Sequence, residues 1–203
     1  MVSFAQEMKK KRGRGLPMDA GTVCYRRFWE GDVWALEELV ELYSDGLLFF
    51  INGFVNNLAV SEDLADETFF EVMSGKNRFK ERCSFKTWLF KIGLHNALDH
   101  LRRQARFPTL PLDEANPELT DGISLERQIL KNEQSRQLHK ALRTLHREYR
   151  TVLHLLYFED MSCAEAGFVL HKSRKQIENL AYRGKKALKS ALEKEGVEFE
   201  DIS

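Results

Sequence analysis

The segment Phe85–Arg106 most narrows the folds that this chain can adopt. On a helix of about 3.6 residues per turn, one of its sides is apolar throughout and carries Phe90, Leu94, Ala97, Leu98 and Leu101. The opposite side is apolar for two turns, and from His95 onward it carries hydrogen-bonding and cationic groups. A surface helix ordinarily keeps one apolar and one polar face along its length. The change along this face is expected of a helix that begins in a protein core and ends against a polyanion.

Helical periodicity also runs through the rest of the chain, and no segment shows the alternation typical of a β-strand. Before Phe85, Gly46 is expected to end one helix, and the apolar run 47–58 is expected to form the next. Ser61 is predicted to cap the helix after that, with acids in the first turn, where the helix dipole favours them. Gly75 suits the position just past the end of this helix. We therefore predict an all-α fold.

Prolines and charge divide the chain into two small helical domains joined by a flexible linker. Pro108, Pro111 and Pro117 fall close together beside several acids, which is typical of an extended connection. The predicted organisation is a flexible basic arm over 1–19, a helical domain over 20–107, the linker over 108–124, a second helical domain over 125–195 and an acidic tail over 196–203.

The second domain contains the pattern of a helix-turn-helix, SCAEAGFVLHKSRKQIENLAYRGKKALKSAL. Ser162, with Glu165 three residues later, forms a capping box that starts a short helix, and 171–173 is predicted to be a turn. A longer helix follows, and its basic outer face carries Lys175, Glu178, Asn179, Tyr182, Arg183 and Lys186. In a major groove these groups would bind phosphates and base edges. The alternative is a solvated basic face on a helical bundle, but the capping box, turn and basic face together favour DNA binding.

The loop before Phe85 has the composition of a site for single-stranded nucleic acid. It places the cations Arg78, Lys80, Arg82 and Lys86 beside the aromatics Phe79, Phe85 and Trp88. Bases stack on aromatic side chains while cations follow the phosphates. Alternatively, the aromatics belong to the core and the arginines are solvated, and these residues alone do not decide between the two interpretations. Trp88 itself is better suited to the core.

Composition excludes several other functions. The net charge is zero, but basic and acidic residues are segregated along the chain, and local charge decides whether phosphates are attracted. The three cysteines are far apart and the histidines form no metal-binding pattern, so we expect no disulfide, metal or other cofactor. We find no catalytic constellation and no apolar run that could span a bilayer. We therefore expect a cytoplasmic protein that is not an enzyme.

Two blocks of the sequence resemble bacterial sigma factors of the sigma-70 family, of the small two-domain extracytoplasmic-function (ECF) type. In the first block, SEDLADETFFEV is similar to the family's E-D-L-x-Q-E-x-F, and WLFKIGLHNALDHLRRQAR to its W-L-x-R-I-A-R-N-x-x-x-D-x-L-R-R. The second block runs from LHKALRTLHREYRTVLHLLYFEDMS through the helix-turn-helix. The order of the blocks across a proline-containing linker makes the resemblance specific.

The resemblance implies a protein that directs core RNA polymerase to promoters and helps to melt the −10 element. It implies that the clamp of the largest polymerase subunit is bound by Asp63, Leu64, Asp66, Glu67, Phe69 and Phe70, whose acids by themselves suit a basic protein partner better than a metal. It implies −10 DNA contacts by Arg78, Phe79, Lys80, Lys86, Lys91, His95, Asn96, Asp99, Arg102 and Arg103. It implies −35 DNA contacts by Lys172, Ser173, Arg174, Lys175, Gln176, Glu178, Asn179, Tyr182, Arg183 and Lys186. The polymerase flap and an anti-sigma factor are further partners that it implies.

Two other functions fit the residues without the resemblance: a helix-turn-helix regulator that is not a polymerase subunit, and an adaptor that only binds polymerase. The chain also departs from the family pattern. Leu94–His95 stands where Arg–Asn is common, Gly167 replaces an alanine and His171 replaces the turn glycine. A residue other than glycine is strained at positive φ, so we expect strain or a different turn at His171. Because of these departures, the promoter sequence that better-matched family members recognise cannot be assigned to this chain.

Overall fold

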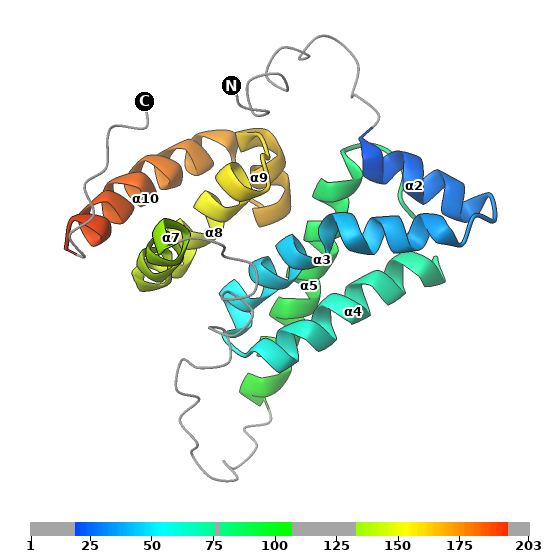
Figure 1. The fold of residues 1–203 in the computed structure, drawn as a ribbon, viewed down its shortest axis with the longest axis horizontal. Helices are drawn as coiled ribbons and strands as arrows, with labels where there is room; N and C mark the ends of the chain where they lie inside the picture. Colours follow the sequence, from blue (N-terminus) through cyan, green and yellow to red (C-terminus); the bar gives the residue numbers. More distant parts are fainter. Residues whose placement is uncertain (1–18, 76–77, 107–132, 195–203) are drawn as a thin grey trace.

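The computed structural model describes residues 19–75, 78–106 and 133–194, and the regular structure within these ranges is entirely helical. Figure 1 shows two groups of helices lying side by side. The first group consists of α2 (Ala20–Trp29), α3 (Trp34–Val55), α4 (Leu58–Ser74) and α5 (Phe85–Arg106). The second consists of α7 (Glu133–Thr144), α8 (Arg147–Leu153), the π-helical η2 (His154–Phe158), α9 (Cys163–Leu170) and α10 (Arg174–Lys194).

The predicted all-α fold of two small helical domains is confirmed, and α5 begins and ends at the predicted residues. The predicted linker over 108–124, the acidic tail over 196–203 and all of the basic arm except Asp19 lie outside the described residues. Within the described residues, no helix combines the length and apolar character needed to cross a membrane.

Two predictions about helix ends in the first domain are wrong. Helix α4 is capped by Asn57, whose side chain accepts a hydrogen bond of 3.1 Å from the amide of Val60, and not by Ser61. Ser61 lies within the helix and is buried, and its hydroxyl donates to the Asn57 carbonyl at 2.6 Å. The acids after Ser61 therefore lie beyond the first turn. Gly75 does end the helix, with a φ of 67° that favours glycine.

Gly46 does not end a helix, because α3 continues through it from Trp34 to Val55. Glycine within a helix costs about 1 kcal/mol relative to alanine. A side chain of the second domain packs directly against this glycine. A Cβ on Gly46 would overlap Oε1 of Glu159. The reason for this glycine therefore lies in packing between the domains and not in the local conformation of α3.

Phe85 is the centre of the first domain's core. Its side chain has no exposed surface, and the rings of Tyr25, Tyr43 and Phe79 surround it. The carboxylate of Asp19 accepts hydrogen bonds from the amides of Thr22, at 2.6 Å, and Phe85, at 2.8 Å. One side chain thus caps the starts of both α2 and α5 and fixes them against each other.

The helix-turn-helix of the second domain is built as predicted. Ser162 and Glu165 form the capping box at the start of α9. His171 ends α9 with φ 53° and ψ 40°, which is the left-handed conformation that the replaced glycine would adopt freely. The chain then turns back so closely that a Cβ on Gly167 would lie 2.6 Å from the carbonyl oxygen of Lys172. This close approach explains why glycine stands where the family has alanine.

Replacing Gly167 with alanine is expected to lower the free energy of unfolding by about 1–3 kcal/mol, because the new Cβ would force the turn after α9 to move. Urea denaturation of the full chain, followed by circular dichroism, measures the change. A glycine-to-alanine change inside an unhindered helix would instead stabilise the protein by up to about 1 kcal/mol. An increase in stability would therefore contradict the close approach between Gly167 and the turn.

Candidate nucleic-acid interface

The outer face of α10 is presented to solvent. Its inner face is fixed by the buried residues Ile177, Ala181 and Gly184. Nine of the ten predicted −35 contacts are exposed, namely Ser173, Arg174, Lys175, Gln176, Glu178, Asn179, Tyr182, Arg183 and Lys186. This face carries four cations, the carboxylate of Glu178, and amide and hydroxyl groups that both donate and accept, so it has the chemistry needed to bind phosphates and base edges.

The start of α10 is held by reciprocal capping and by an ion pair with α8. The amide of Ser173 donates to the side-chain oxygen of Gln176 at 2.7 Å, and the amide of Gln176 donates to the Ser173 hydroxyl at 3.2 Å. Lys172, which is half-buried, lies 2.8 Å from Glu148, and this contact lowers the pKa of the Glu148 carboxyl group. Lys172 therefore positions the turn in this structure, whereas its neighbours face outward.

The second half of α5 is a cationic surface, as its sequence predicts. His95, Arg102 and Arg103 are exposed, with side-chain exposures of 69% for His95 and 65% for Arg102. Asp99 lies between them, 3.2 Å from His95 and 2.8 Å from Arg102. The carboxylate thus orients a histidine and an arginine that point away from the core.

Phe79 and Asn96, two of the predicted −10 contacts, are buried at 8% exposure each. The Phe79 ring packs against Tyr25 and Trp88. The side-chain amide of Asn96 donates to the Thr68 hydroxyl at 3.1 Å. Both side chains hold the domain together in this structure and do not belong to its exposed cationic surface.

The exposed aromatic side chain beside the loop cations is Trp29, at the end of α2. Arg78 lies over its ring, 5.1 Å from the ring centroid, and the Trp29 side chain is 41% exposed. Lys80 is also exposed, whereas Trp88 is half-buried among the core aromatics. Sequence analysis missed Trp29 because it lies far from the loop in the chain, and the fold brings the two together.

An open groove between α3 and α4 has apolar side chains along its length and acids beside them. It is lined by Leu36, Val40, Ser44, Asp45 and Leu48 of α3 and by Glu62, Ala65, Asp66, Glu67, Phe69, Phe70 and Met73 of α4. The Phe70 side chain is 64% exposed. An exposed aromatic beside carboxylates suits a helix with a basic, amphipathic face.

Four of the six predicted polymerase contacts line this groove, namely Asp66, Glu67, Phe69 and Phe70. Leu64 is buried in the core, and Asp63 is exposed outside the groove lining. The α3 side was missed because the motif in the sequence covers α4 alone. Its signal is the recurrence of Leu36 and Val40 at a spacing of four, which places two apolar side chains on one face.

The helix-turn-helix and the two cationic helix faces define a DNA-binding protein, and comparison with known proteins narrows the class further. Residues 39–107 match the model for Sigma-70 region 2, and residues 135–188 match that for Sigma-70, region 4. The chain is 30% identical to the RNA polymerase sigma factor CarQ of Myxococcus xanthus over 173 residues, which cover 82% of this chain and 94% of CarQ. It is 26% identical to the ECF RNA polymerase sigma factor SigW of Bacillus subtilis over 171 residues, covering 80% and 91% of the two chains.

Among solved structures, CnrH in complex with the cytosolic domain of CnrY has a similar fold, with a TM-score of 0.59 at 24% identity over 86% of this chain and 98% of that one. The chain belongs to the sigma-70 family of RNA polymerase sigma factors and is of the ECF type. Sigma factors direct promoter recognition and are not themselves catalytic. In the part of the chain that the structure describes, no cluster of His, Cys, Asp and Glu side chains could hold a metal ion.

Proposed function

We propose that each of three surfaces of this sigma factor has its own partner. The α3–α4 groove binds core RNA polymerase, the exposed second half of α5 with Arg78 and Lys80 binds the −10 element, and the outer face of α10 binds the −35 element. The observation that carries the proposal is the exposure of three different surfaces on one chain: an apolar groove flanked by acids, a cationic helix end and a basic helix of a helix-turn-helix. The protein acts in the cytoplasm, needs no cofactor and catalyses no reaction of its own.

The test is transcription with purified core polymerase. Sequencing transcripts from cells that overproduce the protein would supply a promoter. We expect the protein to co-purify with core polymerase and to give run-off transcripts from that promoter on linear DNA. A regulator that is not a polymerase subunit would instead bind duplex DNA by itself, usually as a dimer. Failure of both co-purification and transcription would reject the proposal.

Replacing Lys175 and Lys186 together with alanine is expected to weaken binding of the holoenzyme to the −35 element and to flatten its salt dependence. Each lost phosphate contact reduces the slope of log K against log salt by roughly 1. The slope is measured by titrating holoenzyme onto labelled promoter DNA at several salt concentrations. Lys194→Ala is a matched control, because Lys194 is exposed at the far end of α10, and it should leave the slope unchanged. An adaptor that only binds polymerase would be insensitive to both changes.

An anti-sigma factor is a further partner that we propose for this chain. Two of the similar solved structures are complexes of a sigma factor with another protein: CnrH with the cytosolic domain of CnrY, and RpoE of Bartonella quintana with the anti-sigma factor NepR. Affinity purification of the tagged protein from its own cells, followed by mass spectrometry, would identify such a partner.

A further inference from the structure

A pocket lined by both helical domains gathers positive charge. It has a volume of about 70 Å³ and is partly open to solvent. One wall comes from the end of α3 and carries the side-chain amides of Asn52 and Asn56. The other wall comes from α7, α8 and η2 and carries Arg143 and Arg150. In the part of the chain that the structure describes, no acidic residue lines this pocket, so its composition is that of an anion site.

Arg150 reaches across the pocket to the end of α3. Its guanidinium donates to the carbonyl oxygen of Gly53 at 2.9 Å and to that of Arg143 at 3.4 Å. Gly53 lies in the last turn of α3, where main-chain carbonyl groups lack a partner within the helix, so Arg150 caps this helix end. The cap uses only part of the donors of a guanidinium group. The Nε atom is buried and has no hydrogen-bond partner among the described residues.

The positive charge beside this helix end is not neutralised by the cap, because a carbonyl group carries no net charge. Burial, and after it the charges of Arg143 and Arg147, lower the pKa of Arg150, so its surroundings disfavour the cation. Arg147 lies one turn earlier in α8, with its guanidinium over the Phe54 ring, 5.6 Å from the centroid. A partly buried cation without a counterion costs free energy, and a bound anion would offset that cost.

Glu159 contacts a residue of the lining, but it is already paired with other cations. Its carboxylate, with a side-chain exposure of 10%, lies 3.4 Å from Nε2 of His154, which lines the pocket, and 3.0 Å from Nζ of Lys86 on α5. Lys86 also donates to the Glu159 main-chain carbonyl at 3.0 Å. The charge of Glu159 is therefore engaged by these two partners and does not serve Arg150.

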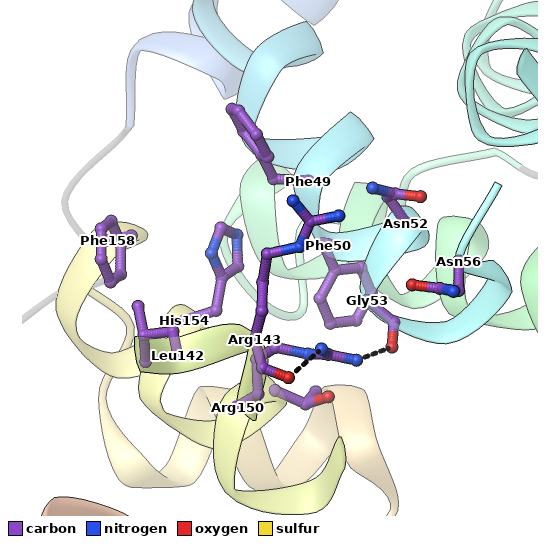
Figure 2. Close-up of a pocket in the computed structure, with 11 residues that line it drawn as sticks. Phe49, Phe50, Asn52, Gly53, Asn56, Leu142, Arg143, Arg150, His154 and Phe158 are labelled. Atoms are coloured by element: carbon purple, nitrogen blue, oxygen red, sulfur yellow. Dashed lines mark hydrogen bonds between the residues drawn. The ribbon is translucent and has the colours of Figure 1, made fainter. Parts of the chain in front are cut away.

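The donors of the pocket lie around a space that suits a phosphoryl group. Figure 2 shows the side chains of Arg143 and Arg150 reaching from the second domain toward α3, where Asn52 and Asn56 lie. A cavity needs about 10–15 Å³ to hold one water molecule, so this one admits a group of several heavy atoms. Guanidinium groups pair strongly with phosphate. A phosphate ester carries a charge of about −1.5 to −2 at pH 7 and several acceptor oxygens, so it can contact both walls at once.

We propose that this pocket binds a phosphoryl group, supplied by inorganic phosphate or by a small phosphate ester, with Arg143 and Arg150 as its principal contacts and Asn52 and Asn56 as further donors. The open side of the pocket would let the rest of an ester extend into solvent. None of these four residues is among the predicted polymerase, −10 or −35 contacts, so the proposal does not rest on the function proposed above. Sequence alone does not reveal the site, because its two walls come from segments far apart in the chain.

Isothermal titration calorimetry of the full-length protein in phosphate-free buffer measures binding. The probes are inorganic phosphate and glycerol 1-phosphate, and sodium chloride at matched ionic strength is the control. We expect saturable binding of at least one phosphoryl probe and none of chloride. Tighter binding of glycerol 1-phosphate would identify an ester as the source of the group, and equal or tighter binding of inorganic phosphate would identify the free anion. If neither probe binds saturably at millimolar concentrations, the proposal is wrong.

Two variants locate the site. Arg143→Glu places a carboxylate in the pocket as a counterion for Arg150 and keeps the main-chain carbonyl that Arg150 uses, so we expect phosphate binding to be lost. Arg150→Met removes a charged donor of similar length and should weaken binding by roughly 10- to 100-fold. Lys194→Glu is the matched control, because it reverses a charge at the exposed far end of α10, and it should bind phosphate as the parent protein does.

Thermal unfolding followed by circular dichroism gives a second readout. A ligand that binds only the folded protein raises the midpoint of unfolding, so phosphate should raise the midpoint of the parent and of Lys194→Glu but not that of Arg143→Glu. The basic face of α10 is another region that attracts phosphate, and the variant with both Lys175→Ala and Lys186→Ala tests it. We expect that variant to keep the parent's affinity. If it loses phosphate binding while Arg143→Glu and Arg150→Met retain it, phosphate binds to α10 and the pocket is rejected.

Discussion

Replacing Phe85 with alanine is expected to lower the free energy of unfolding by about 3–5 kcal/mol, the usual cost of removing a buried phenylalanine side chain. Phe85 has no exposed surface, and the ring centroids of Tyr25, Tyr43 and Phe79 lie between 5.6 and 5.7 Å from its own. These rings come from α2, α3 and the loop before α5, so they cannot fill the space without moving separate elements. Such a loss is a large part of the roughly 5–15 kcal/mol that stabilises a typical domain.

Urea denaturation followed by far-ultraviolet circular dichroism measures this effect on the full chain. Phe70→Ala is the matched control, since it removes the same side chain from a position that is 64% exposed, and it should change stability by less than about 0.5 kcal/mol. If Phe85→Ala and Phe70→Ala had equal midpoints, Phe85 could not be the centre of the core.

Phe70→Ala is expected to affect polymerase binding and not stability. We expect it to reduce affinity for core polymerase by roughly 30- to 100-fold and to abolish transcription at limiting polymerase. Aromatic side chains that insert at the centre of an interface typically contribute 2 kcal/mol or more. Phe70 is the most exposed large apolar side chain among those lining the α3–α4 groove, and Asp66 and Glu67 lie beside it. Competition against a labelled parent protein for core polymerase measures the affinity.

Trp34→Ala is the control for this prediction. Trp34 is an aromatic side chain at the start of α3, 74% exposed, and is not among the residues that line the groove. We expect the variant to compete as well as the parent protein. If Trp34→Ala weakened binding and Phe70→Ala did not, polymerase would dock on the α2–α3 corner and the assignment of the groove would be wrong.

Sequence predicts well those parts of the fold that are determined by residues close together in the chain. The bounds of α5 follow from its own periodicity, and the start of α9 follows from Ser162 and Glu165, which are three residues apart and bond to each other. The start of α4 was misplaced because Asn57 and Ser61 are both suitable caps one turn apart, and local preference does not choose between them. The prediction that Gly46 ends a helix is wrong because its packing partner, Glu159, is more than a hundred residues away in the chain.

The candidate site also contains some residues that sequence predicts and others whose places depend on how the helices pack. The outward face of α10 follows from one helix's pattern, so its exposed residues were predictable from sequence alone. The burial of Phe79 and Asn96 depends on Tyr25 of α2 and Thr68 of α4, which periodicity within one segment cannot reveal. The α3 side of the groove and Trp29 were missed for the same reason, because each acquires its neighbours only when the helices pack.

The π-helical segment η2 determines the direction in which Glu159 points. Helix α8 runs directly into η2, where the amide of Glu159 donates to the carbonyl of His154 five residues earlier. A π-helical turn contains one residue more than an α-helical turn. Deleting one residue from η2 would restore regular α-helix and rotate the chain after it by about 100°, turning Glu159 away from Lys86 and changing the angle at which the helix-turn-helix meets α5. The position of this carboxylate is therefore set by chain length, and insertions or deletions here would change how the two domains pack even where every side chain is kept.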